Sequence, residues 1–120
     1  MGVIHKKRPG VYDWEGVNIV TYDKPTVKGV SKRVLIGPKE NATDFAMRYF
    51  EVEPGGHSAR ESHPEVHEVI VLKGRGRVLM GEEYHDLAEG DVVYVGPNEQ
   101  HQFLAAEEEG LGFICVAPKP

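Results

Sequence analysis

Residues 54–74 read PGGHSARESHPEVHEVIVLKG, and this stretch decides how the chain folds. On a helix, His63 and His67 would share one face, as in zinc-protease motifs. Those motifs need glutamate directly after the first histidine, where this chain has Pro64. The residue before a proline favours extended geometry, so we expect His63 to close a strand. The β-branched run after His67 favours a second strand over a helix. The stretch therefore predicts strand, turn and strand.

This geometry brings potential metal ligands together. Glu61 lies two residues before His63, so both side chains project from the same face of the first strand. His67 opens the next strand, and the three side chains can converge on one point. His101, which follows the turn at residues 96–98, is a fourth candidate. Imidazole and carboxylate together suit Mn, Fe, Zn, Ni or Cu. The alternative to a metal site is that these histidines are surface residues or hydrogen-bonded core residues.

Short apolar segments alternate with turn residues along the chain, which is typical of an all-β protein. The predicted strands are Val17–Thr21, Val34–Ile36, Phe45–Val52, His67–Leu72, Arg77–Met80, Asp91–Val95, Gln102–Ala105 and Gly112–Ala117. Residues 54–56 predict a turn, and Gly74-Arg75-Gly76 predicts a hairpin turn. His85 is placed on a short strand between two turns and is assigned no role. We expect a small sandwich or barrel, lined by alternate residues and almost free of helix.

The spacing resembles the first motif of the cupin superfamily, G-x5-H-x-H-x3,4-E-x6-G. In this chain the register runs through Gly55, Glu61, His63, His67 and Gly74. Two positions have exchanged identity, because glutamate stands where the motif has its first histidine and histidine stands where it has glutamate.

The spacing also resembles the second cupin motif, G-x5-P-x-G-x2-H-x3-N. Here the register runs through Gly90, Gly96, Pro97, Asn98 and His101. Glycine replaces the first proline of the motif, and asparagine replaces its second glycine. The resemblance implies an all-β double-stranded β-helix, the jelly-roll barrel of cupins. It also implies similarity to small single-domain cupins that bind manganese through four histidines.

The resemblance implies a metal site made of Glu61, His63, His67 and His101, with Mn or Fe as the expected metal and Zn, Ni or Cu as alternatives. Glu61 stands where the four-histidine subgroup has an imidazole. Its carboxylate either binds the metal directly or acts as a catalytic base beside a three-histidine metal.

Residues that share the barrel interior with the metal would shape a substrate pocket. By alternation, Val69 and Phe103 are inward neighbours of the ligands, and plain core packing is the alternative for both. Phe113 and Cys115 share a face of the last strand and are further candidates for the pocket lining. Cys115 is interpreted either as an inert core residue or as a pocket thiol. The polar strand residues Arg48, Tyr49 and Tyr94 are interpreted as ordinary strand residues with polar tips at the surface, and the alternative is that they orient a substrate.

The chain has 120 residues, which predicts one domain with a core over about residues 34–117 and an N-terminal arm over about residues 1–16. The net charge of −5 argues against a nucleic-acid or anionic-membrane partner. No apolar run is long enough to span a membrane. A single cysteine and the absence of a signal-peptide pattern predict a cytoplasmic protein.

The leading functional hypothesis is a metal-dependent enzyme acting on a small organic molecule, most plausibly by dioxygenase-type oxidation, as the cupin resemblance implies. The alternatives are a non-enzymatic module that binds a small ligand, and a metal-assisted isomerase or decarboxylase, because the same fold hosts all of these. An exposed sheet edge is an aggregation hazard unless it is covered, so a homodimer is expected, with the N-terminal segment as a candidate for packing on the partner.

Overall fold

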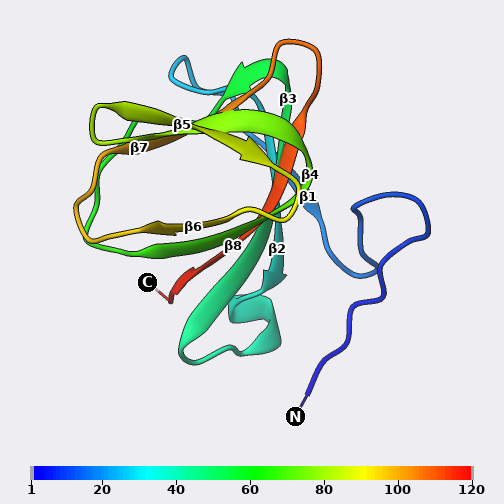
Figure 1. Cartoon of the computed structure of the whole chain (residues 1–120). Coiled ribbons are helices and arrows are strands. Elements are labelled where there is room, and N and C mark those ends of the chain that lie inside the picture. The colour runs from blue at the N-terminus through cyan, green and yellow to red at the C-terminus, as the bar shows by residue number, and fades with distance from the viewer. Residues whose placement is uncertain (1, 120) are drawn as a thin grey trace.

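The computed structural model describes residues 2–119 and shows an all-β jelly-roll barrel (Figure 1). Its strands are β1 (Ile19–Thr21), β2 (Lys28–Ile36), β3 (Phe45–His57), β4 (His67–Met80), β5 (Glu83–Ala88), β6 (Val92–Val95), β7 (His101–Ala105) and β8 (Leu111–Pro118). Within residues 2–119 the helical content is the single 3-10 turn η1 (Pro38–Glu40), in keeping with the prediction. No helix in this range is long and apolar enough to cross a membrane.

Two long strands, β3 and β4, belong to both sheets of the barrel. Strand β3 pairs with β8 over residues 45–52 and reaches β7 at His57. Strand β4 pairs with β6 and β8 in its first half and with β5 and β7 in its second half. In Figure 1, β5 and β7 lie on one side of the barrel, and β6 and β8 lie on the other. The bends in β3 and β4 thus close the barrel and leave an interior between the sheets.

The hairpin predicted at residues 74–76 is wrong, because β4 runs unbroken through this segment. The turn predicted at residues 54–56 likewise lies inside β3. Both glycine-rich segments mark the places where a long strand bends from one sheet to the other. At Gly74 the backbone has φ +80°, and an added Cβ would lie 1.7 Å from the carbonyl oxygen of Gly110. Glycine is needed here for close backbone approach and left-handed geometry, not for chain reversal.

Gly74→Ala is therefore expected to destabilise the barrel strongly. The left-handed conformation costs an L-residue about 1–2 kcal/mol, and overpacking typically adds about 1–3 kcal/mol. Urea unfolding should show that Gly74→Ala lowers the free energy of unfolding by both costs together. Gly81→Ala is the matched control, because Gly81 also has a positive φ (+63°) but nothing lies within 4 Å of its added Cβ. Equal losses in the two variants would contradict the close-approach argument.

Alternate residues of the facing strands form the core, as the period-2 pattern predicts. Val69 of β4 is paired on one side with Val93 of β6 and on the other with Cys115 of β8, and all three are buried. The rings of Phe103 and Phe113 stack with their centroids 4.5 Å apart. These contacts show which residues of β7 and β8 face the interior.

The N-terminal segment packs on the outer surface of its own barrel. Tyr12 stacks on Tyr49 and Trp14 packs at an angle to it, with centroids 5.4 Å apart in both pairs. Asp13 accepts a 3.1 Å hydrogen bond from Nε of Arg33 on β2. Tyr49 lies on the outer face of β3 but is fully buried by this cover, so the prediction that its polar tip lies at the surface is wrong. The segment predicted to pack on a partner chain thus already has contacts within one chain, and its role in a dimer stays a prediction.

Candidate metal centre

Three histidines come together on the inner wall of the barrel. His67 begins β4, His101 begins β7, and His63 lies in the connection that precedes β4. One nitrogen of each ring lies within 4.8 Å of the others. The Nε2 atoms of His63 and His67 are 3.0 Å apart. The structure therefore brings together the three imidazoles that the sequence places at this point.

Backbone hydrogen bonds hold the connection between β3 and β4 against β7. Glu61 and His101 form an antiparallel bridge in which each amide donates to the other's carbonyl, at 3.1 and 2.9 Å. The amide of Asn98 donates to the carbonyl of His63 at 2.7 Å. Asn98 adopts a left-handed conformation (φ 61°) that turns the chain into β7. These bonds fix the backbone on both sides of the histidine cluster.

The hydrogen bonds that His63 and His101 make through Nδ1 turn their Nε2 atoms toward the cluster, where these atoms can bind a cation. Nδ1 of His63 lies 2.8 Å from the carbonyl oxygen of Glu65, and Nδ1 of His101 lies 2.9 Å from that of Glu99. A carbonyl oxygen can only accept, so each Nδ1 carries the proton and each Nε2 keeps its lone pair. This arrangement of a ring N–H on a carbonyl is common for metal-binding histidines.

His67 completes a set of imidazoles suited to a divalent transition metal. Burial, with the nearby positive charge of Arg48, lowers the pKa of His67 to about 4, so its ring is neutral near pH 7. Its Nδ1 lies 3.1 Å from Sγ of Cys115, on the side of the ring away from His63. Three imidazole nitrogens converging in this way fit Mn, Fe, Zn, Ni or Cu.

Glu61 lies beside the histidine cluster. Its Oε1 is 3.7 Å from Nε2 of His63 and 3.8 Å from Nε2 of His101. Both distances exceed hydrogen-bond length, and the carboxylate is about half exposed. The side chain also borders the cavity, so the position suits either of its two predicted roles, metal ligand or base.

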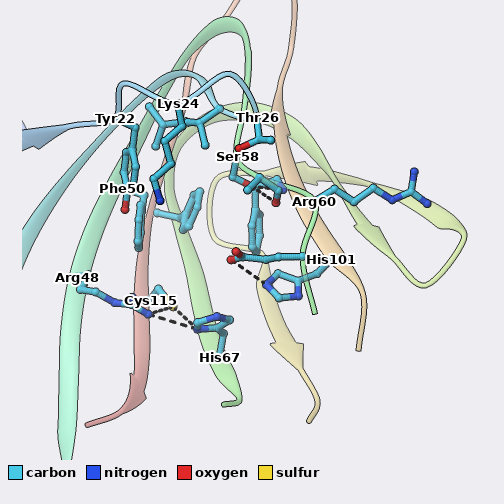
Figure 2. A pocket seen from close by; sticks show the side chains of 16 residues that line it. Tyr22, Lys24, Thr26, Arg48, Phe50, Ser58, Arg60, His67, His101 and Cys115 are labelled. Atoms are coloured by element: carbon cyan, nitrogen blue, oxygen red, sulfur yellow. Dashed lines mark hydrogen bonds and ion pairs between the residues drawn. The ribbon is translucent and has the colours of Figure 1, made fainter. Parts of the chain in front are cut away.

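A cavity of about 370 Å³ opens beside the histidines (Figure 2). Among the residues predicted to line a pocket, Phe103, Phe113 and Cys115 border this cavity. Val69 does not border it and is 2% exposed within the core cluster. His67, His101 and Glu61 form part of the wall.

Two parts of the cavity differ from the preferred interpretation of the sequence. Arg48, predicted to have its tip at the surface, instead points inward and lies 3.4 Å from both Nδ1 of His67 and Sγ of Cys115. The connection between β1 and β2, residues 22–27, contributes side chains to the mouth and was assigned no role. The available signal for Arg48 was its place two residues before Phe50, since both share one face of β3. Tyr94, by contrast, is exposed as predicted.

Comparison with known proteins agrees with this architecture. A family model described as Cupin domain matches residues 48–117. A curated relative from Rhodospirillum rubrum, named 1-methylthio-D-xylulose 5-phosphate methylsulfurylase, is 38% identical over 108 residues, which cover 88% of this chain and 68% of the relative.

Two solved structures are similar over nearly the whole chain. A cupin 2 conserved barrel domain protein from Rhodopseudomonas palustris is 33% identical with a TM-score of 0.88, and the match covers 98% of this chain and 81% of that protein. A cupin-2 domain protein from Rhodospirillum rubrum is 35% identical with a TM-score of 0.86, covering 96% and 78%. The match extends well beyond the motif segment.

Proposed function

Because this chain belongs to the cupin family, we propose that it is a metal-dependent enzyme that acts on a small organic molecule inside the barrel. The observation that carries the proposal is the convergence of His63, His67 and His101, with one nitrogen of each ring within 4.8 Å of the others. Two of these residues, His67 and His101, also border the cavity of about 370 Å³. A substrate in this cavity would therefore lie against the imidazoles.

The three histidines are the proposed ligands, and manganese or iron is the proposed metal. Zn, Ni and Cu suit the same donors and are distinguished by metal analysis. When bound, the metal supplies a positive charge that polarises a substrate oxygen. The carbonyl oxygens of Glu65 and Glu99 accept hydrogen bonds from Nδ1 of His63 and of His101, respectively. These bonds orient the two rings and hold the metal-binding Nε2 atoms in place.

Glu61 is the proposed base. Its carboxylate borders the cavity next to the Nε2 atoms of His63 and His101, so it is placed to take a proton from a substrate held there. The half-exposed side chain can then exchange that proton with water. Direct coordination of the metal by Glu61 is the alternative, and the substitution Glu61→Gln separates the two roles.

The first substrate to test is 1-methylthio-D-xylulose 5-phosphate, because a relative that is 38% identical carries this compound in its name. Protein reconstituted with Mn or Fe is expected to consume it, whereas metal-free protein is not. Full activity without metal would overturn the proposal. If the metal-loaded protein leaves this compound unchanged, a panel of phenolic, thiol, diketone and sugar substrates follows.

Oxygen consumption measured in the same assay separates the predicted reaction classes. Dioxygenase-type oxidation requires oxygen uptake in step with substrate loss. Substrate loss under anaerobic conditions would contradict that prediction and favour a non-oxidative reaction, such as isomerisation or decarboxylation. Saturable binding of a ligand without any turnover would favour the non-enzymatic alternative.

We also propose that the protein is a homodimer that buries an apolar face. This face consists of partly exposed side chains on the outer surface of β3, β4 and β6, namely Phe45, Met47, Ile70, Val92 and Tyr94. Ile70 pairs with Val92 across β4 and β6, and β8 joins β4 to β3 within the same sheet. Contiguous apolar patches of this kind mark interaction sites, and a second copy is the simplest symmetric occupant.

Tyr94→Lys is expected to shift the protein from dimer to monomer, because burying a lysine ammonium in an interface is costly even beside a carboxylate such as Glu68, the cross-strand neighbour of residue 94. Light scattering coupled to size-exclusion chromatography at micromolar concentration measures the mass directly. Tyr84→Lys is the matched control, since Tyr84 is similarly exposed, at 50% against 57%, but lies on β5. A monomeric mass for the unmodified protein would refute the dimer.

A further inference from the structure

Lys24 and Arg48 border the cavity, Lys32 lies beside Tyr22 of the same wall, and none of the three has an acidic partner in the part of the chain that the structure describes. Within residues 2–119 no carboxylate lies within ion-pair distance of any of them. The side-chain hydrogen bonds of Arg48 go to His67 and Cys115, and its Nε is buried with no partner among the described residues. A guanidinium that is partly desolvated in this way normally has an anion beside it.

The three cations come from different elements but share one region. Arg48 is on β3, and its guanidinium lies 5.3 Å from the centre of the Phe50 ring. Lys24, on the connection between β1 and β2, extends down from the mouth toward the Phe50 side of the cavity (Figure 2). Lys32 is on β2, with Nζ 5.7 Å from the centre of the Tyr22 ring.

The electrostatics of Lys32 support this grouping. Burial lowers its pKa, and the positive charges of Arg48 and Lys24 lower it further. Lys32 is therefore near enough to Arg48 and Lys24 for their charges to repel it. A bound anion would relieve that repulsion, and it would be stabilised by charge-assisted hydrogen bonds to each cation.

We propose that Arg48, Lys24 and Lys32 form an anion subsite that holds a phosphate monoester group of the substrate. A dianion matches a cluster of three cations better than a monoanion does, and the planar fork of Arg48 suits two phosphate oxygens. The proposal rests on the proposed function, because it assigns the anion to the substrate of the same cavity. These three residues would select the substrate by binding its phosphorylated end.

The subsite lies on the side of His67 that faces away from the other two histidines. Arg48 approaches His67 from its Nδ1 side, whereas Nε2 of His67 faces His63. Glu61 lies beside the other two histidines, so the proposed base and the cation cluster contact the substrate at different points. A phosphate at Arg48 would thus anchor one end of a short molecule while another part lies against the histidines.

The test measures inorganic phosphate binding to metal-free full-length protein by calorimetry, so that phosphate cannot bind a metal instead. Arg48→Met is expected to weaken phosphate binding by about 10-fold or more, the loss typical of a hydrogen bond to a charged group. Arg77→Met is the matched control, because Arg77 is exposed on β4 beside Tyr84, outside the cavity. Its phosphate affinity should equal that of the unmodified protein.

Lys24→Met provides a second variant on an exposed connection, in case Arg48→Met does not fold, and it should also weaken binding. Equal phosphate affinity in the unmodified protein and in whichever of these variants folds would overturn the proposal. Acetate binding as tightly as phosphate would overturn the phosphate assignment in favour of a carboxylate. Metal content and turnover are measured separately from phosphate binding. If the unmodified protein takes up no metal, the proposed function is refuted. The subsite would still be supported if the variants lose phosphate binding.

Discussion

Replacing His63 by alanine is expected to remove the bound metal and to abolish turnover. The substitution deletes one of the three convergent imidazoles and leaves His67 and His101, which are insufficient for a stable site at this position. Loss of a residue that only hydrogen-bonds to a metal ligand typically weakens metal binding by about 10–100-fold. Loss of a ligand itself should therefore weaken metal binding by more than that. The metal content of purified His63→Ala should fall from nearly one ion per chain to a trace.

Elemental analysis of untagged protein purified without chelator measures this directly, and the same samples give the activity. His85→Ala is the matched control, because His85 lies exposed on β5, outside the cluster. It should keep both metal and turnover. Stoichiometric metal in His63→Ala would contradict the assignment of this residue as a ligand, and equal losses in the two variants would point to a general effect on folding.

The histidine cluster shows how far local spacing can predict a site. Pro64 forces the chain to turn between His63 and His67, so the two side chains meet without a helix. His101 joins them because its antiparallel bridge to Glu61 holds the segment before β4 against β7, and the resemblance to cupins had already implied that His101 belongs to the site. The all-β class followed from the turn rhythm and from the β-branched runs alone.

Glycine misled the prediction of strand boundaries. In a single sequence, Gly74-Arg75-Gly76 has the composition of a hairpin turn, but here the glycines sit where β4 crosses from β8 to β7. An added Cβ at Gly76 would lie 2.1 Å from the carbonyl oxygen of Leu104. That requirement comes from a segment distant in sequence, so no local pattern can reveal it.

The cation cluster was missed for a related reason. Whether Arg48 faces inward depends on the phase of β3, which is set by its pairing with Cys115 on β8. Alternation alone leaves two possible phases, and the sequence interpretation placed the polar tips of both Arg48 and Tyr49 at the surface. The structure resolves this because Tyr12 and Trp14 cover Tyr49 from outside. A residue can thus be fully buried and still lie on the outer face of the barrel.

Glu61→Gln is expected to retain metal but to lower turnover by about 10²–10⁴-fold, the usual contribution of a general base. The amide is nearly isosteric with the carboxylate, so the backbone bridge between residue 61 and His101 should persist. The substitution removes the carboxylate that accepts a proton. In the unmodified protein its Oε1 lies 3.7 Å from Nε2 of His63 and 3.8 Å from Nε2 of His101. Metal analysis and turnover of the same sample give both quantities.

Glu65→Gln is the matched control, because its carboxylate lies 3.8 Å from Nδ1 of His63, on the side of the ring away from the cluster. That variant should keep turnover, since the ring is oriented by the backbone carbonyl of Glu65, which the substitution leaves in place. Loss of metal in Glu61→Gln but not in Glu65→Gln would instead make Glu61 a fourth ligand. Full turnover in Glu61→Gln with metal retained would exclude both roles, because neither a base nor a charged ligand survives the change. The assignment of Glu61 as the base therefore requires that Glu61→Gln keeps its metal and loses turnover. The same result would show that three imidazoles are enough to hold the ion.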